Sequence, residues 1–335
     1  MGISRNNKMK SSKNRNFCIA AVLFLLFIPA ITLNNNYFLH FLVLCFIWGV
    51  TAEAWNLIMG YAGIFSFGQI AFFTIGAFAA GLLSLQLDVS PWLGMPLAGL
   101  ITACVGFLIG LPSLRLKGEY IALVTYALHM LLGALVFRGK AIGIETGGFL
   151  WNIPSLTFFG YEFPRNSVIS WYYLGLVLFL LFLLFIYWII HSPIGRAFVA
   201  LRDAEPLAQS LGIDQFKYKL IVFSLSAFIT GVMGAFYAYY VAVISSRMLG
   251  LDFFVKALIM VLLGGIGRFP GAAIGAFIIT IGYEAMRPLM SYRLIVLGIF
   301  VILTIIYLPG GIMGGTDYLE KIRKWRQKNK EIMSQ

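Results

Sequence analysis

Ionisable side chains inside long apolar segments are the first residues of this sequence that could do chemistry. Glu53 falls within the apolar segment 37–59, and His129 lies midway along the apolar segment 119–138. A charge at the centre of a membrane helix costs about 2.5–3.5 kcal/mol on insertion scales, so such residues often mark proton relays or solute paths. A lone His is more often a satisfied core residue, which makes Glu53 the stronger candidate. Asp252 and Lys256, four residues apart, are spaced to form an ion pair on one helix.

A glycine-rich stretch that follows Glu53 has the composition of a break in a membrane helix. Each glycine lowers helix stability by about 1 kcal/mol relative to Ala, and a broken helix exposes backbone groups that can hold a carboxylate or an ammonium. Close packing between helices is the more frequent explanation for any single glycine. Polar residues beside the break are therefore better candidates than the glycines. The resulting substrate-path candidates are Glu53, Gly60, Gly63, Ser66, Gly68 and Gln69.

The segment 191–216, between two apolar stretches, is predicted to form two short helices. Ser192 can cap the first helix, with Pro193 at its first position. Asp203 can cap the second helix, and Gly212 is placed to end it in a left-handed conformation.

The second of these helices carries a small apolar stripe, formed by Ala204, Leu207, Ala208 and Leu211 at i, i+3, i+4 and i+7. A shallow apolar face with a charged rim suits docking into a groove on a soluble partner. An amphipathic loop that lies on lipid, or on its own bundle, fits the pattern equally well. The predicted docking residues are Arg196, Arg202, Asp203, Ala204, Glu205, Leu207, Ala208, Leu211 and Gly212.

Enzyme chemistry is not visible in the sequence. It contains no Gly-x-Ser-x-Gly, His-Glu-x-x-His or Cys-x-x-Cys motif. It also lacks the phosphate-binding Gly-x-x-x-x-Gly-Lys-Ser/Thr motif, so any ATP hydrolysis must come from another chain. The three histidines and three cysteines are scattered without metal-type spacing. We therefore expect a protein that is not an enzyme and binds no cofactor or metal of its own.

Composition places the chain in a membrane. Of its 335 residues, 60% are hydrophobic and 11% are charged, whereas a soluble domain carries roughly 25% charged residues. The net charge of +12 gathers mainly in the two tails and in short loops, as topology signals and anionic-lipid contacts do, which argues against nucleic-acid binding.

The apolar segments predict an all-α, polytopic membrane protein with about ten helical spans. Most of the 25 basic residues lie on one side if both termini are cytoplasmic. This scheme gives a basic tail at 1–16, a membrane domain at 17–310 with a cytoplasmic loop at 191–216 and an external loop at 139–168, and a basic tail at 311–335. Segments 253–267 and 270–287 are short, and their merger would change the count. The predicted spans are 17–33, 37–59, 63–87, 92–112, 119–138, 169–190, 217–243, 253–267, 270–287 and 293–309.

Several motifs, in one consistent order from about 55 to 314, resemble those of the LivM-type permeases of ABC transporters for branched-chain amino acids. They include the loop Ser192–Ile213, Gly60-Tyr-Ala-Gly63 and Gly264-Gly-Ile-Gly267. The two glycine motifs also faintly echo each other. Further matches are Leu114–Thr125, Thr146–Gly148, Pro270-Gly271 and Leu308–Gly311.

The resemblance implies a permease with no catalysis of its own, in the cell inner membrane. It implies a second, LivH-like permease, two cytoplasmic ATPase subunits that use ATP, and a periplasmic or lipid-tethered binding protein. The loop 191–216 would be the coupling element, with Glu205-Pro206-Leu-Ala208 where the strict signature reads Glu-Ala-Ala. Close relatives carry urea or short amides, which remain alternatives to branched-chain amino acids. An ion-coupled transporter or channel is the alternative of another class.

Overall fold

The computed structural model describes most of the predicted membrane domain. The predicted span 17–33 lies outside the described residues except for Pro29, as do the N-terminal tail 1–16 and most of the C-terminal tail 311–335. The described residues are 29, 36–116, 118–139, 144, 148–158, 161–163, 168–286, 292–307 and 310–314.

Six of the described helices are long and apolar enough to cross a membrane. The first consists of α2 (Asn36–Asn56) and its π-helical continuation η1 (Leu57–Tyr61). The others are α3 (Gln69–Gln86), α4 (Pro91–Ser113), α5 (Tyr120–Phe137), α6 (Val168–His191) and α9 (Gln215–Val241). Five of them coincide with a predicted span to within two residues, whereas α3 begins at Gln69 rather than at 63, because residues 63–68 are not helical. The prediction of a mainly helical protein is confirmed, with six candidate membrane spans among the described residues.

Three further predicted spans appear as shorter helices: α10 (Leu251–Gly264), α11 (Gly271–Ala285) and α12 (Arg293–Tyr307). At 1.5 Å per residue, 14 or 15 residues rise about 21–23 Å, which is less than the roughly 30 Å of a hydrocarbon core. The segments 253–267 and 270–287 are not merged, because six residues separate the two helices. The count of about ten spans stays a prediction.

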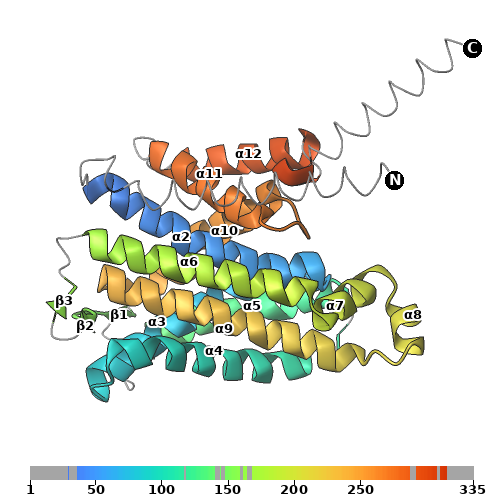
Figure 1. Ribbon diagram of the computed structural model, residues 1–335, viewed down its shortest axis with the longest axis horizontal. Coiled ribbons are helices and arrows are strands. Elements are labelled where there is room, and N and C mark those ends of the chain that lie inside the picture. The colour runs from blue at the N-terminus through green and yellow to red at the C-terminus, as the bar shows by residue number, and fades with distance from the viewer. Residues whose placement is uncertain are drawn as a thin grey trace, which may run out of the picture.

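The centre of the bundle consists of α2, α3 and α9, with α4, α5 and α6 around them (Figure 1). Close contact between α3 and α9 depends on glycines. A Cβ atom at Gly76 would lie 2.2 Å from the Gly231 carbonyl oxygen, and one at Gly234 would lie 2.0 Å from the Phe73 carbonyl oxygen. Small residues at these positions let two membrane helices approach until their backbones touch.

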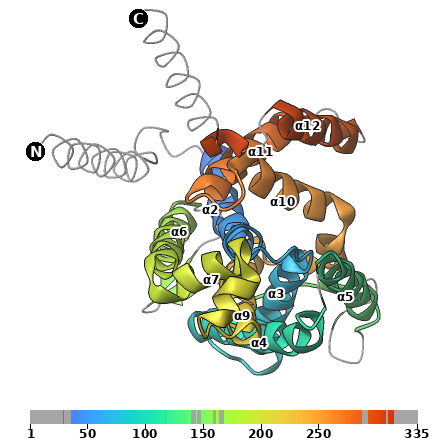
Figure 2. The ribbon, with the colours of Figure 1, turned by 90° about the vertical axis from the view of Figure 1, so that its right-hand side faces the viewer.

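The helices α10 and α11 form a tight hairpin that packs along α2 (Figure 2). A Cβ atom at Gly271 would lie 2.6 Å from the Gly264 carbonyl oxygen, and one at Gly275 would lie 2.1 Å from that of Met260. The order of these contacts, with 271 near 264 and 275 near 260, makes the two helices antiparallel. The loop between them lies at the same end of the bundle as η1.

The two ends of the bundle carry different structures (Figure 1). One end carries the short helices α7 (Pro193–Asp203) and α8 (Glu205–Ser210). The other carries the turn η3 (Ser246–Leu249) and four two-residue strands in two antiparallel pairs. The pairs are β1 (Phe149–Leu150) with β4 (Ile244–Ser245), and β2 (Thr157–Phe158) with β3 (Tyr161–Glu162). The predicted loops 191–216 and 139–168 thus lie at opposite ends.

Candidate functional site

The first helix of the loop 191–216 begins as predicted. The Ser192 hydroxyl accepts a hydrogen bond from the backbone N–H of Gly195 at 3.3 Å, and Pro193 occupies the first turn. The apolar face of α7 carries Ala197, Phe198 and Leu201, all buried against the bundle. The cap and the buried face together hold α7 against this end of the helix bundle.

The start of the second helix differs from the prediction. Asp203 is the last residue of α7 and does not cap α8, whose N-cap residue is Ala204 and has no side-chain cap. The reason is the neighbouring cation: the Arg202 Nε atom donates to the Asp203 carboxylate at 2.8 Å. This hydrogen bond also lowers the pKa of Asp203. Gly212 ends the segment at φ +82°, in the predicted left-handed conformation.

The predicted apolar stripe on α8 does not form one exposed face. Ala208 is 2% exposed, whereas Leu207 is 61% and Leu211 is 74% exposed. Ala208 therefore packs against its own chain, and the small side chain lets α8 lie close to the bundle. The ion pair between Glu205 and Lys219 of α9, at 3.1 Å, fixes the helix in this orientation. Leu207 and Leu211 remain as an outward ridge, one helical turn apart, with Arg196 also exposed on α7.

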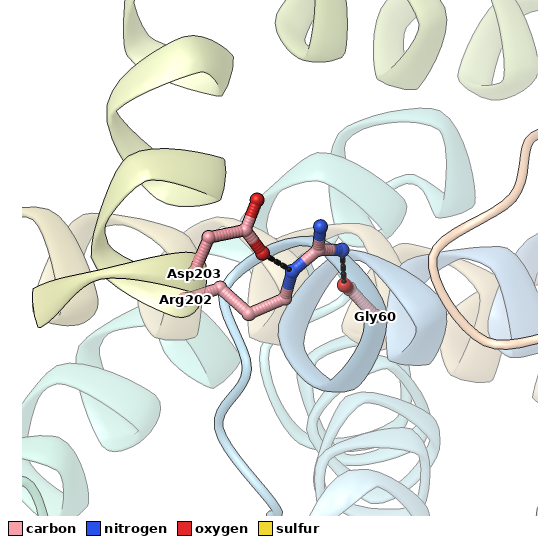
Figure 3. Close-up of polar contacts among 3 residues, drawn as sticks. All are labelled: Gly60, Arg202 and Asp203. Carbon is pink, nitrogen blue, oxygen red and sulfur yellow. Dashed lines mark hydrogen bonds and ion pairs between the residues drawn. The ribbon is translucent and has the colours of Figure 1, made fainter.

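Arg202 connects α7 to the glycine-rich break that follows α2. One of its terminal nitrogens donates to the Gly60 carbonyl oxygen at 2.6 Å, on the side opposite its contact with Asp203 (Figure 3). Gly60 lies in η1, a π-helical turn, and such turns frequently occur at functional sites. Gly63 follows at φ +67°, and a Cβ atom there would lie 2.7 Å from the Arg202 Cγ atom. The Arg202 side chain therefore packs against the backbone from Gly60 to Gly63.

The loop between α10 and α11 also contacts Gly60. A Cβ atom at Gly60 would lie 2.2 Å from the backbone nitrogen of Gly267. The Asn56 side chain binds the loop at both of its polar atoms: its oxygen accepts from the Gly267 N–H at 2.8 Å, and its nitrogen donates to the Arg268 carbonyl at 3.1 Å. The two glycine motifs that echo each other in sequence therefore touch in space, beside Arg202.

Glu53 is fully buried and binds the start of α11. One carboxylate oxygen accepts from the Ala273 N–H at 3.0 Å, and the other accepts from the Asn56 side chain at 3.1 Å. Ala273 lies in the first turn of α11, where backbone N–H groups have no partner within the helix. Glu53 therefore supplies a hydrogen-bond acceptor to the N-terminus of α11. This is a structural role, and Glu53 would keep it even if its side chain also lined a solute path.

The polar path candidates beyond the break are also fully buried. The Ser66 hydroxyl accepts from the Gly68 N–H at 3.3 Å. The Gln69 amide nitrogen donates to the hydroxyl of Ser226 at 2.9 Å and also to that of Thr230, so it links α3 to α9. Among the described residues, the Gln69 amide oxygen has no hydrogen-bond partner. His129 is buried, with its Nε2 atom 3.0 Å from the Leu249 carbonyl oxygen.

The site as a whole is a junction at one end of the bundle. It joins α7, the break η1 and the α10–α11 loop through Arg202, Gly60 and Asn56. The sequence predicts Arg202 and Gly60 in two separate roles, and its patterns assign no site role to Asn56 or Gly267. The echo between the two glycine motifs was the one signal that could have indicated their contact. Among the described residues, no cluster of three or more His, Cys, Asp or Glu side chains could hold a metal ion.

Comparison with known proteins identifies the family. The model of the family described as branched-chain amino acid transport system / permease component matches residues 37–306. The chain belongs to this permease family. The match extends from α2 to α12 and includes the whole junction around Arg202, so the junction is part of the permease domain.

The most informative relatives are LivM and LivH permease proteins of high-affinity branched-chain amino acid transport systems. The chain is 30% identical to LivM of Salmonella typhimurium over 297 residues, which cover 82% of this chain and 70% of the relative. LivM of Escherichia coli gives the same identity and coverage. LivH of Salmonella typhimurium is 26% identical over 82% of this chain and 93% of its own length. No solved structure matches this permease.

Proposed function

We propose that this permease is the translocation subunit of an ATP-driven importer for branched-chain amino acids. The observation that carries the proposal is the family match from 37 to 306, with LivM proteins among its relatives. The chain would lie in the cell inner membrane, with both termini and the α7–α8 end in the cytoplasm. The bias of basic residues toward that side supports this orientation.

The same comparison supports a proposal for the partners of this subunit. Both LivM and LivH proteins are similar to this chain, which supports a pseudo-symmetric pair made of this subunit and a second, LivH-like permease. Two cytoplasmic ATPase subunits would supply the energy, since the chain has no phosphate-binding motif. A periplasmic or lipid-tethered binding protein would deliver the solute. This subunit itself would be neither an enzyme nor an ATP-binding protein.

Coupling would start at the exposed ridge of α8. Leu207 and Leu211 are the apolar groups available to enter a groove on an ATPase subunit, with Arg196 on the rim. Displacement of the α7–α8 unit would move Arg202, which belongs to α7. The hydrogen bond from Arg202 would then pull on the Gly60 carbonyl. Because Gly60 also touches the α10–α11 loop, one displacement at this end would reach both α2 and the hairpin.

An ion-coupled transporter or channel is less consistent with the polar groups of the described residues. A proton or ion relay needs ionisable side chains free to exchange their partners. Glu53, the carboxylate that the sequence favours for such a relay, already accepts hydrogen bonds from the Ala273 N–H and from the Asn56 side chain. A urea or short-amide permease of the same family is the second candidate for the solute, because the binding protein rather than the permease could select it.

Uptake measurements on the reconstituted complex test the proposal. The complex of two permeases, two ATPases and the binding protein is placed in proteoliposomes, and uptake of labelled leucine, urea and acetamide is compared with and without ATP. Leucine uptake that requires ATP is the expected result. Uptake of urea or acetamide in its place would reassign the solute, and ATP-independent uptake by this chain alone would refute an ABC permease.

A further inference from the structure

Lys256 on α10 is a cation inside the bundle that the junction does not use. Its Nζ atom lies 4.9 Å from the ring centroid of Trp48 and 4.8 Å from that of Tyr283. Both distances fall within the roughly 6 Å of a cation–π contact. The predicted ion pair with Asp252 is wrong, because the ammonium turns to the two rings instead. Trp48 belongs to α2 and Tyr283 to α11, so three helices meet at this ammonium.

The two rings hold the ammonium without neutralising it. Within the part of the chain that the structure describes, no carboxylate lies within 4.0 Å of Lys256 Nζ, and no oxygen accepts its N–H groups. The Glu284 carboxylate, on the neighbouring α11, accepts a hydrogen bond from the Tyr37 hydroxyl at 2.8 Å. An ammonium has three donors, so an anion could bind here without breaking an existing hydrogen bond.

The position suits a solute that enters from the strand-bearing end. Trp48 lies near the middle of the 26-residue span Asn36–Tyr61, and Lys256 is in the second turn of α10, which begins at that end. In the orientation of the proposed function, the ammonium would lie between the middle of the membrane and its external side. Ionisable groups at such depth are rare and commonly mark solute paths. Apolar surface is adjacent, because the Phe253 ring lies 5.9 Å from that of Trp48.

We propose that the Lys256 ammonium binds the carboxylate of the amino acid during translocation, with Trp48 and Tyr283 holding the ammonium in place. A zwitterionic amino acid brings a carboxylate into a region of low dielectric, where an attractive cation is worth far more than in water. The aliphatic side chain would lie against the neighbouring aromatic rings. The inference rests on the proposed function, since urea and acetamide have no carboxylate.

Direct binding separates this role from a structural one. The transporter in lipid nanodiscs, without its binding protein, is titrated with leucine and with leucinamide, which keeps the amino group and side chain but lacks the carboxylate. The unmodified transporter is expected to prefer leucine at least about tenfold, as a charge-assisted contact implies. Lys256→Met should abolish the preference, and Lys256→Arg should retain it. Arg115→Gln, which removes an exposed positive charge elsewhere, is the control for net charge.

The outcomes distinguish failure of this inference from failure of the proposed function. If the unmodified complex imports leucine but Lys256→Met keeps the same preference for leucine over leucinamide, Lys256 has only a structural or interfacial role and the inference is wrong. A transporter that prefers leucinamide, or binds both equally, contradicts it as well. If the unmodified complex imports urea or acetamide but not leucine, the proposed solute fails first, and the carboxylate site fails with it.

Discussion

Replacement of Arg202 by Met is the most informative perturbation of the junction. Methionine keeps an aliphatic stem of similar shape against Gly63 but removes both guanidinium contacts, with Gly60 at 2.6 Å and with Asp203 at 2.8 Å. A hydrogen bond from a charged donor is worth about 1.5–3 kcal/mol. The Arg202 side chain is 33% exposed, so solvent screening places the loss near the lower end, at about 1.5 kcal/mol. Each 1.4 kcal/mol is a factor of ten.

We therefore expect Arg202→Met to lower leucine uptake per ATP hydrolysed about tenfold. The measurement is labelled leucine uptake and phosphate release by the same proteoliposomes, at matched abundance of the complex. ATP hydrolysis should persist, because the outward ridge of Leu207 and Leu211 is untouched. Arg202→Lys should recover part of the uptake, since a single ammonium can still donate to the Gly60 carbonyl.

The matched comparison is Asp203→Asn, which removes only the exposed ion pair. Such pairs contribute about 0.2–1 kcal/mol, so the loss of coupling should be less than about fivefold. If Arg202→Met imports leucine with normal stoichiometry, the contact with Gly60 does not transmit movement. If Asp203→Asn is as damaging as Arg202→Met, the loss comes from the ion pair with Asp203, which contradicts a coupling role for the bond from Arg202 to Gly60.

Three further variants test other parts of the site. Gly60→Ala should lower uptake and abundance, because its Cβ atom meets backbone of the α10–α11 loop at 2.2 Å, whereas Gly133→Ala, with 3.8 Å to the nearest side-chain atom, should be tolerated. Glu53→Ala should lower the Tm of the purified complex, since an unpaired buried N–H costs about 1–3 kcal/mol, and Glu53→Gln, which keeps an acceptor, should lower it less; equal Tm values for all three proteins would contradict the helix-terminus role. Leu211→Asp should leave abundance normal, because Leu211 is 74% exposed, yet should reduce uptake and stimulated ATP hydrolysis together; normal uptake would remove the ridge from the docking surface.

Hydropathy predicts the long helices well, and capping chemistry predicts two of the three helix ends assigned in the loop 191–216, those at Ser192 and Gly212 but not the one at Asp203. Continuous apolar segments predict the six long helices, because backbone groups in lipid can form all their hydrogen bonds only within a helix or a closed barrel. Ser192 and Gly212 also act as their residue types indicate, since a cap or a left-handed helix end depends on neighbours a few positions away. These features are encoded locally and can be read without knowledge of the fold.

Contacts between distant segments could not be predicted in the same way. The bond from Arg202 to Gly60 joins residues 142 positions apart, and nothing in either segment specifies the other. The sequence also could not predict which side of α8 faces the bundle, because Ala208 and Leu211 are both apolar and only the packing decides which of them is buried. For the same reason, i to i+4 spacing wrongly paired Lys256 with Asp252, when two aromatic rings from other helices were the actual neighbours.

The central claim is that this subunit carries branched-chain amino acids across the membrane at the expense of ATP hydrolysed by its partners. Uptake of labelled leucine by proteoliposomes that contain the full complex and the binding protein tests it most directly. The account predicts leucine accumulation against its gradient with ATP present, and none with this chain alone. Accumulation without the ATPase subunits, or ATP-driven uptake of urea or acetamide with leucine excluded, would contradict it.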